Sequence, residues 1–304
     1  MIRVLEPGLL TTVQDGGRWG NQDLGVPVAG PIDQVSHRVA NLLVGNDPEC
    51  ATLEATLVGP TVEFLTETVF AVAGGEFELW LDGDPVEVNM ARYARFGGIL
   101  QFGRRTAGAR AYLALAGGID VPATLGSRST DLASGLGGCP LRAGDRLDVG
   151  SAQSSQPALG ESRKVLDLPE GGATLRFLVG PDAFRFSSEA MTVFTHSRYR
   201  VGPDSNRMGY RLLGKTLDMA DDSPILSSAT PSGTIQIPPS GEPILLMADH
   251  QTTGGYAKIG TVITVDLAAA GQLAPGDWIT FEACDHGDAV AALIAIEQAL
   301  WCSA

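Results

Sequence analysis

The chain of 304 residues is poor in lysine, in clustered positive charge and in long apolar runs. Only Lys164, Lys215 and Lys258 are lysines, and the formal net charge is −14. Binding to a nucleic-acid backbone or to an anionic membrane surface requires clustered cations, so we expect neither partner. No stretch reaches the length of a membrane span, and the first residues lack the apolar core of a signal peptide. We therefore expect a cytoplasmic protein.

Cysteine and histidine motifs of known chemistry are also scarce. The sequence contains no C-x-x-C pair, no H-E-x-x-H, no G-x-S-x-G and no Rossmann fingerprint. Widely spaced cysteines without a paired motif are typical of reduced, mostly buried thiols in the cytosol. We predict no protein-bound structural metal. The four cysteines are Cys50, Cys139, Cys284 and Cys302.

Glycine and proline, in contrast, are abundant, with 38 and 18 copies. They separate short runs of β-branched and alternating apolar residues, which is typical of many short strands joined by tight turns. The sequence therefore predicts a mainly β protein of antiparallel barrels or sandwiches with a few short helices. A polar stretch at residues 151–172 has no periodicity and is a candidate linker. We predict domains at residues 1–155 and 172–304.

Two helices interrupt this β pattern. The first is predicted at residues 31–44, because Pro31 suits a first turn and apolar residues follow on one face, and Gly45 suits its end. The second is predicted at residues 288–301 and is apolar on nearly every side. Such a helix is either sunk in the core of its own chain or docked on another chain.

A weak internal echo indicates two similar halves. Residues 141–147 read Leu-Arg-Ala-Gly-Asp-Arg-Leu, and residues 273–279 read Leu-Ala-Pro-Gly-Asp-Trp-Ile. Each is followed by a strand-like segment. A Gly-Asp turn before a strand is common, so the echo is only a hint of a duplicated barrel.

Polar residues and glycines concentrate in four stretches, two of them in the N-terminal half. Asp15, Arg18 and Asp33 lie at residues 14–33 and could bind an anion or an amide, although tight turns capped by the two carboxylates explain them equally simply. Arg128 and Ser129 lie in a glycine-rich loop at residues 117–131. An arginine flanked by hydroxyls can grip a carboxylate or a phosphate, but a solvated loop has the same composition.

The other two stretches lie in the C-terminal half. Arg207 precedes residues 209–216, which match G-x-x-x-x-G-K-T, but no buried strand comes before this segment and no good helix after it, so we do not expect a P-loop. Asp249 and His250 follow an apolar strand and lead into Gln251, Thr252 and Thr253. Acid, imidazole, amide and hydroxyl groups at a strand end are typical of the edge of a site.

These loops closely resemble the allophanate hydrolase subunit 2 family, which includes the C subunit of 5-oxoprolinase and is carboxyltransferase-like. The resemblance covers essentially the whole chain in order. One departure is Ala29, where most relatives are expected to have serine. The matching motifs are Gln14-Asp15-Gly16-Gly17-Arg18, Gly25-Val26-Pro27, Gly30-Pro31, Asp33, residues 40–46, Leu53-Glu54, Gly117-Gly118-Ile119-Asp120, Gly126-Ser127-Arg128-Ser129-Thr130, residues 207–212, Ile235-Gln236 and residues 251–256.

The resemblance implies two cyclophilin-like β-barrel domains and a hetero-oligomer. It implies an allophanate hydrolase subunit 1-like partner, which is the B subunit of 5-oxoprolinase, and a third protein, which is its A subunit. Together the three would open 5-oxo-L-proline to L-glutamate, with ATP and Mg²⁺ as co-substrates at a site shared with the partner. Within it we assign Asp15 and Asp249 as the catalytic residues, which would orient water, metal or a substrate NH. The residues assigned to substrate or anion binding are Arg18, Asp33, Arg128, Ser129, Arg207, Gln251, Thr252 and Thr253.

Two other functions stay open. One is a carboxyltransferase-type subunit in urea or allophanate metabolism, which requires a biotin carrier, and this chain has no Met-Lys carrier motif. The other is a non-catalytic regulatory partner that sequesters an inhibitor of a kinase, a role that needs only a docking surface. Neighbouring genes for a carrier, a sensor kinase or a third oxoprolinase subunit would discriminate among them.

Overall fold

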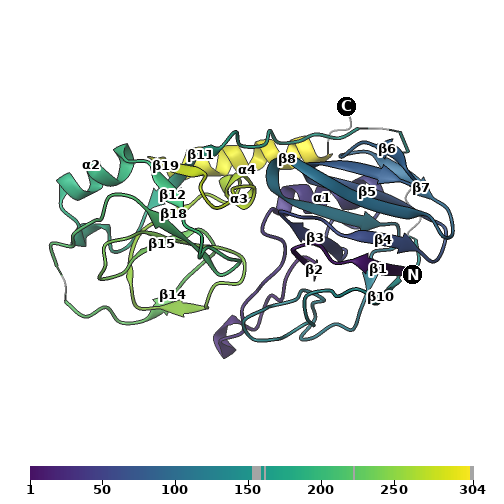
Figure 1. The fold of residues 1–304 in the computed structure, drawn as a ribbon. Coiled ribbons are helices and arrows are strands. Elements are labelled where there is room, and N and C mark those ends of the chain that lie inside the picture. The colour runs from purple at the N-terminus through teal and green to yellow at the C-terminus, as the bar shows by residue number, and fades with distance from the viewer. Residues whose placement is uncertain (153–158, 161, 222, 302–304) are drawn as a thin grey trace. The chain divides into compact units, whose positions relative to one another are not determined.

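The computed structural model describes residues 1–152, 159–160, 162–221 and 223–301, which fall into two compact units (Figure 1). Unit 1 comprises residues 1–19, 29–168 and 300–304, and unit 2 comprises residues 20–28 and 169–299. The chain passes from one unit to the other at Leu168 and Pro169. This point lies within the predicted linker at residues 151–172, of which residues 153–158 and 161 are outside the described part of the chain.

The prediction of a mainly β protein with two barrel-like sheets and a few helices is confirmed. Unit 1 contains a ten-stranded sheet whose main path has the order β2-β3-β8-β4-β1-β10-β9. Strand β5 lies off this path and pairs with β6, β7 and β8. The strands of this sheet are β1 (Ile2–Glu6), β2 (Leu10–Gln14), β3 (Thr52–Thr56), β4 (Thr61–Phe64), β5 (Thr68–Leu81), β6 (Asp84–Val86), β7 (Ala91–Ala94), β8 (Ile99–Leu115), β9 (Ile119–Asp120) and β10 (Arg146–Val149).

The two long strands β5 and β8 pair along most of their length, and their register shifts three times between Gly74 and Leu79. Such bulges bend a sheet, and Gly74, with φ +104°, takes a conformation that side chains rarely allow. The bend lets one face of the sheet enclose an apolar core. This core includes Ile2, Val4, Leu53, Val62, Phe64, Phe70, Val72, Leu100 and Leu113.

Helix α1 (Gln34–Leu43) starts three residues later than predicted. The prediction placed Asp33 inside the first turn, but Asp33 is extended at φ −104° and ψ 91° and caps the helix. Its carboxylate accepts hydrogen bonds from the backbone N of Ser36 at 3.0 Å and from the Ser36 Oγ at 2.5 Å. An acceptor at this position satisfies N–H groups that the first turn leaves without a partner, so the cap decides where the helix begins.

Unit 2 is built around a closed barrel in the order β11-β18-β15-β16-β13-β12-β19. The barrel closes by parallel pairing of β11 with β19, and its other pairs are antiparallel. A two-stranded ribbon of β14 (Ser228–Ala229) and β17 (Thr253–Gly254) lies outside this barrel. The barrel strands are β11 (Gly172–Val179), β12 (Tyr199–Val201), β13 (Gly209–Leu213), β15 (Thr234–Ile237), β16 (Ile244–Leu246), β18 (Ala257–Val262) and β19 (Trp278–Ala283).

The sequence echo forms the same turn in both units. Gly144 and Gly276 have φ +93° and +97°, and in each case the following aspartate accepts a hydrogen bond from the backbone N three residues before it, at 2.7 and 2.8 Å. Each turn also makes two backbone hydrogen bonds with one valine of a neighbouring strand, Val4 in β1 or Val201 in β12. The two units therefore share the conformation and hydrogen bonds of this turn as well as its sequence motif.

The remaining helices belong mainly to unit 2. They are α2 (Ser188–His196), α3 (Asp266–Gly271) and α4 (His286–Trp301), with short 3₁₀ turns at Gln22–Leu24 and Ala183–Arg185. Helix α4 begins two residues before the predicted start, and the Asp285 carboxylate accepts from the backbone N of Asp288 at 2.8 Å. The helix is not sunk in a core, because Val290, Leu293 and Ile294 keep 39–52% of their surface exposed. None of the helices within the described ranges has the length and apolar character needed to cross a membrane.

Candidate functional site

The predicted site residues fall into two sets, one in each unit. Asp15, Arg18, Asp33, Arg128 and Ser129 lie in unit 1. The second set, in unit 2, consists of Arg207, Asp249, Gln251, Thr252 and Thr253.

Asp15 follows the end of β2 and organises the loop at residues 127–129. Its carboxylate accepts hydrogen bonds from the Ser127 Oγ at 2.5 Å, the Arg128 backbone N at 2.6 Å and the Ser129 Oγ at 2.7 Å. The backbone N of Gly17 donates a fourth at 3.1 Å. Burial raises the pKa of Asp15, but these four donors outweigh it and hold the pKa below its ordinary value. The carboxylate is therefore ionised and fully engaged by its own protein.

Arg18 is completely buried beside the same loop. Its Nε donates to the carbonyl of Thr124 at 2.9 Å, and its Nη2 donates to the carbonyl of Ser129 at 2.7 Å. The third nitrogen, Nη1, makes no hydrogen bond in the structure. Two of the three guanidinium nitrogens thus fix the loop that carries Arg128, and the third is unused.

The Arg128 side chain differs from its buried neighbours because 40% of it is exposed. It forms an ion pair with Asp120, with Nη2 and Oδ1 2.8 Å apart, and its Nε has no hydrogen-bond partner. The adjacent Ser129 hydroxyl is completely buried and is used by Asp15. Of this predicted pair, the arginine side chain is the group that a ligand can reach.

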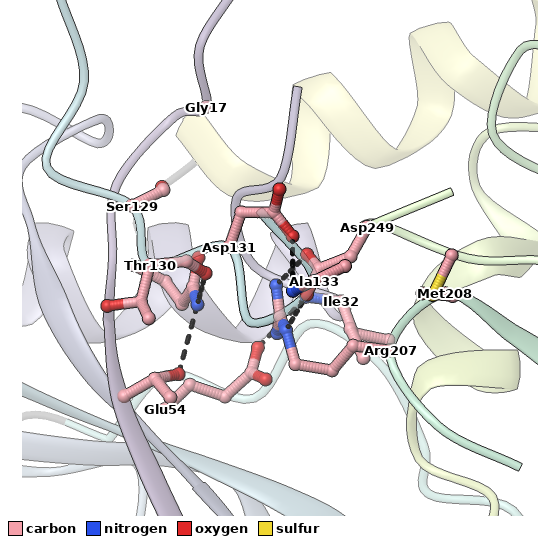
Figure 2. A network of polar contacts seen from close by, with 12 residues as sticks. Gly17, Ile32, Glu54, Ser129, Thr130, Asp131, Ala133, Arg207, Met208 and Asp249 are labelled. Atoms are coloured by element: carbon pink, nitrogen blue, oxygen red, sulfur yellow. Dashed lines mark hydrogen bonds and ion pairs between the residues drawn. The ribbon is translucent and has the colours of Figure 1, made fainter. Parts of the chain in front are cut away.

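Asp33 belongs to a hydrogen-bonded chain that the sequence analysis missed. Its backbone N donates to the Tyr112 hydroxyl at 2.8 Å, and that hydroxyl donates to the Glu54 Oε2 at 2.7 Å. Glu54 also accepts from the backbone N of Ile32 at 2.9 Å; both residues are drawn in Figure 2. Burial, followed by the Glu54 charge, raises the pKa of Tyr112 well above its ordinary value. Glu54 lies in the middle of β3, where four of the five residues are buried. A charged residue within such a strand was the signal that could have identified it.

His37 lies next to this chain, with its ring edge-on to Tyr112. Its side chain is 1% exposed, and Nδ1 is 2.9 Å from the Thr52 Oγ1. Burial lowers the pKa of His37 to about 4, in spite of the opposing charges of Asp15 and Glu54. The histidine is therefore neutral near pH 7.

In unit 2, Arg207 and Asp249 form a closed, bidentate ion pair (Figure 2). The Arg207 Nε and Nη2 donate to the two carboxylate oxygens of Asp249 at 2.9 and 2.8 Å. Both side chains are buried, with 3% and 1% exposed. The backbones are also joined, since the Asp249 N donates to the Arg207 carbonyl at 2.9 Å. The predicted anion-binding arginine and the predicted catalytic acid thus hold each other.

The predicted rim residues follow this pair in the chain. Thr253 is exposed, while Gln251 and Thr252 are half-buried. The His250 Nδ1 donates to the Gln251 carbonyl at 2.7 Å, and its Nε2 lies 3.1 Å from the Ser232 Oγ. Burial lowers the pKa of His250. Beneath the rim lie two groups that the sequence analysis did not select, Gln236 and Lys258, which are 1% and 4% exposed.

The structure bears on the P-loop pattern at residues 209–216 and on metal binding. The segment resembling a P-loop begins with the barrel strand β13 (Gly209–Leu213), and no helix follows it at residues 214–221 or 223–233. Its backbone therefore cannot form a phosphate cradle at a helix start. Across the described residues, no group of three or more His, Cys, Asp or Glu side chains is placed to hold a metal ion.

The chain is a β protein of two units, with polar glycine-rich loops beside the strand ends. The family model "Carboxyltransferase domain, subdomain A and B" matches residues 24–283. The chain belongs to this family, which confirms the resemblance drawn from its loops.

The comparisons include complete relatives and parts of larger enzymes. The chain is 40% identical to the C subunit of 5-oxoprolinase from Escherichia coli (strain K12), over 96% of this chain and 94% of the relative. It is 36% identical to the protein of the same name from Haemophilus influenzae, over 93% and 91%. The crystal structure of K. lactis urea amidolyase matches with a TM-score of 0.92 and 32% identity, over 99% of this chain but 20% of that one. A further solved relative, 39% identical, is matched over 55% of its length.

Proposed function

We propose that this chain is one component of an ATP-dependent 5-oxoprolinase, a hydrolase that converts 5-oxo-L-proline, ATP and water to L-glutamate, ADP and phosphate. The observation that carries the proposal is the 40% identity to the C subunit of a 5-oxoprolinase across 96% of this chain and 94% of that relative. A match over almost the full length of both chains supports the same kind of component, rather than a shared domain in a different protein.

The chemistry of this reaction fits the polar loops. A lactam carbonyl is a poor electrophile because amide resonance stabilises it, and phosphorylation of its oxygen by ATP creates a leaving group. Such a site needs donors for a carboxylate and for phosphate oxygens. In unit 1, Arg128 is the better placed donor, because its side chain is partly exposed and its ion pair with Asp120 lies at the surface. Arg207 is a weaker candidate because Asp249 already engages it.

We assign Asp15 and Asp249 to positioning within this proposal, rather than to direct proton transfer. Each carboxylate is held by donors of its own unit, four at Asp15 and the bidentate arginine at Asp249. Gln251, Thr252 and Thr253 remain the proposed substrate rim, with Thr253 exposed. ATP and Mg²⁺ are proposed as co-substrates that bind at a site shared with a partner protein.

The proposal includes partner proteins and a cytoplasmic location. The B subunit of 5-oxoprolinase, similar to allophanate hydrolase subunit 1, and the A subunit complete the proposed enzyme. The exposed Val290, Leu293 and Ile294 on α4 support a chain that works in a hetero-oligomer, since apolar side chains of this size favour contact with another protein.

The test is ATP-dependent release of glutamate from 5-oxo-L-proline by this chain co-expressed with the partner proteins encoded beside it. Activity should disappear when this chain is omitted. In the complete complex, Arg128→Ala should lower kcat/KM by about tenfold or more, because a charge-assisted hydrogen bond is lost. Arg104→Ala removes a comparable surface ion pair, with Glu78 at 3.2 Å, and should leave activity unchanged. A fully assembled complex without glutamate release would refute the function.

Carboxyl transfer in urea metabolism is the second candidate. It is favoured by the likeness to K. lactis urea amidolyase, with a TM-score of 0.92 over 99% of this chain. The same complex, supplied with urea, bicarbonate, ATP and a biotin carrier and carboxylase, would then form a carboxylated urea. Formation of this product without glutamate release from 5-oxo-L-proline would move the assignment to the second candidate.

A further inference from the structure

A buried lysine without a carboxylate partner lies beneath the predicted rim of unit 2. Lys258 is 4% exposed, and its Nζ donates to the Ser228 Oγ at 2.6 Å and to the Gly254 carbonyl at 3.4 Å. Both acceptors are neutral. Asp182 contacts Lys258 only at its backbone N, at 3.0 Å, and forms its ion pair with Arg185 instead. No carboxylate within the described part of the chain forms an ion pair with the Lys258 ammonium. A buried charge is expensive unless an opposite charge compensates it.

Gln236 places a second unused donor beside this ammonium. It lies opposite Lys258 in the register of β15 and β18, so both side chains stand on the same face of the sheet. The Gln236 side chain is buried, and its Nε2 makes no hydrogen bond in the structure. Its Oε1 accepts from the Gln251 Nε2 at 3.4 Å, which directs the amide nitrogen away from that contact. Unpaired buried donors of this kind need an explanation.

The cluster lies directly under the surface at Gly254. A Cβ added to Gly254 would lie 2.5 Å from the Gln236 Nε2 and 3.4 Å from the Gln251 Nε2. Gly254 is itself half-buried, and its neighbours Thr253 and Gly255 are exposed. The cover over the donors is the ribbon of β14 and β17, which has two residues in each strand. One glycine backbone thus separates the unpaired amide from the exterior.

We propose that Lys258 and Gln236 form a binding site for a small carboxylate, which in the proposed function is the carboxylate of 5-oxo-L-proline. The site offers an ammonium with at most two of its three hydrogens used and an amide with neither of its two hydrogens used. Such a set selects a ligand with several acceptor oxygens and a negative charge. The choice of a carboxylate and of the lactam rests on the proposed function, whereas the preference for an anion with several acceptor oxygens rests on the donors.

The test is the dissociation constant of 5-oxo-L-proline, measured by titration calorimetry on the full chain and on its complex with co-expressed partner proteins. Lys258→Met should weaken binding at least tenfold. Gly254→Ala should weaken it several-fold, because its methyl group must displace the Gln236 amide, which is the movable end of a side chain. Gly255→Ala is the matched control, since its Cβ would meet only the Ser227 Oγ and the Ile225 carbonyl, at 3.3 and 3.5 Å.

Two further probes identify the chemistry. 5-Oxo-L-prolinamide, which lacks the carboxylate, should bind weakly and without sensitivity to Lys258→Met. Inorganic phosphate should not compete with 5-oxo-L-proline; if only phosphate binds in a manner that depends on Lys258, the carboxylate assignment is wrong. If Lys258→Met does not fold, the comparison of Gly254→Ala with Gly255→Ala decides.

The outcomes separate this site from the proposed function. Turnover of 5-oxo-L-proline with unchanged binding and KM in Lys258→Met and Gly254→Ala would overturn the site and keep the function. Absence of turnover in the complete complex, together with carboxylate binding that depends on Lys258, would keep the site and reject the function. Acetate serves as the probe in the second case, because it presents the carboxylate alone.

Discussion

Asp15 in unit 1 and Lys258 in unit 2 are both buried charges, but they are satisfied to different extents. Asp15 is 9% exposed and receives four hydrogen bonds from its own unit. Lys258 is 4% exposed and has two neutral acceptors, one of them 3.4 Å away. The comparison teaches that burial alone does not identify a binding group. What separates a charge that holds the fold together from one that awaits a ligand is the number of its unused hydrogen-bonding positions.

The largest expected effect concerns the most completely paired charges. Arg207→Met should lower the free energy of unfolding of unit 2 by about 3–5 kcal/mol, because it removes the guanidinium that pairs with the buried Asp249 carboxylate. Urea denaturation measures the change. Arg104→Met, which breaks an ion pair with 76% and 40% exposed side chains, should cost less than about 1 kcal/mol. Equal effects of the two substitutions would contradict the role of burial in this comparison.

The second effect depends on pH and belongs to unit 1. The pKa of His37 is about 4 in the folded protein and 6.5 when unperturbed, so between these values the unfolded chain binds a proton that the folded chain does not. The contribution is fully present above pH 6.5 and is lost as the pH falls to about 4, by about 3 kcal/mol in total. Urea denaturation at a series of pH values should show this slope in the wild type. His37→Asn should remove it, and a slope that persists unchanged would refute the assignment.

A smaller effect on stability is expected when the Asp15 carboxylate, which accepts four hydrogen bonds, is changed to an amide. Asp15→Asn should destabilise unit 1 by about 2 kcal/mol, because an amide nitrogen must face one of the donors of residues 127–129. The control is Asp120→Asn, which weakens only the exposed pair with Arg128 and should change stability by less than about 1 kcal/mol. Thermal and urea unfolding of both variants provide the measurement. If Asp15→Asn were as mild as its control, Asp15 would not organise this loop.

The smallest effect is expected at Lys258. Lys258→Met should change the free energy of unfolding of unit 2 by less than about 1 kcal/mol, or raise it, because the substitution removes an uncompensated buried charge and keeps a long apolar side chain. Ser228 is an exposed residue, so its hydroxyl can bind water instead. A loss as large as that of Arg207→Met would place Lys258 among the groups that maintain the fold, and the contrast with Asp15 would fail.

Much of the architecture could be predicted from local patterns, because strands and turns are encoded by nearby residues. The alternating apolar runs and glycine turns predicted the β class, and the echo around Gly144 and Gly276 led to two turns with the same hydrogen bonds. The start of α1 was placed three residues early because Pro31 is a favourable first-turn residue, whereas the cap at Asp33 determines the boundary.

The states of the site residues could not be predicted, because their partners are distant in the sequence. Three of the four donors that engage Asp15 lie at positions 127–129, more than a hundred residues away. Arg207 and Asp249 were selected separately, and their mutual pairing follows only from the fold of unit 2. Lys258 was overlooked because a single lysine in a strand is usually exposed, and its burial depends on a ribbon whose strands come from two separate segments.

The parallel contact between β11 and β19 has a consequence for synthesis of the protein on the ribosome. The first barrel strand begins at Gly172, and its partner at that end is Trp278. All strands of the unit 1 sheet have been made by residue 149, whereas the barrel cannot close until the chain has been extended to Ala283. The edge of β11 is therefore left unpaired while about a hundred further residues are translated, and a chain that stops before β19 would present this edge to other molecules.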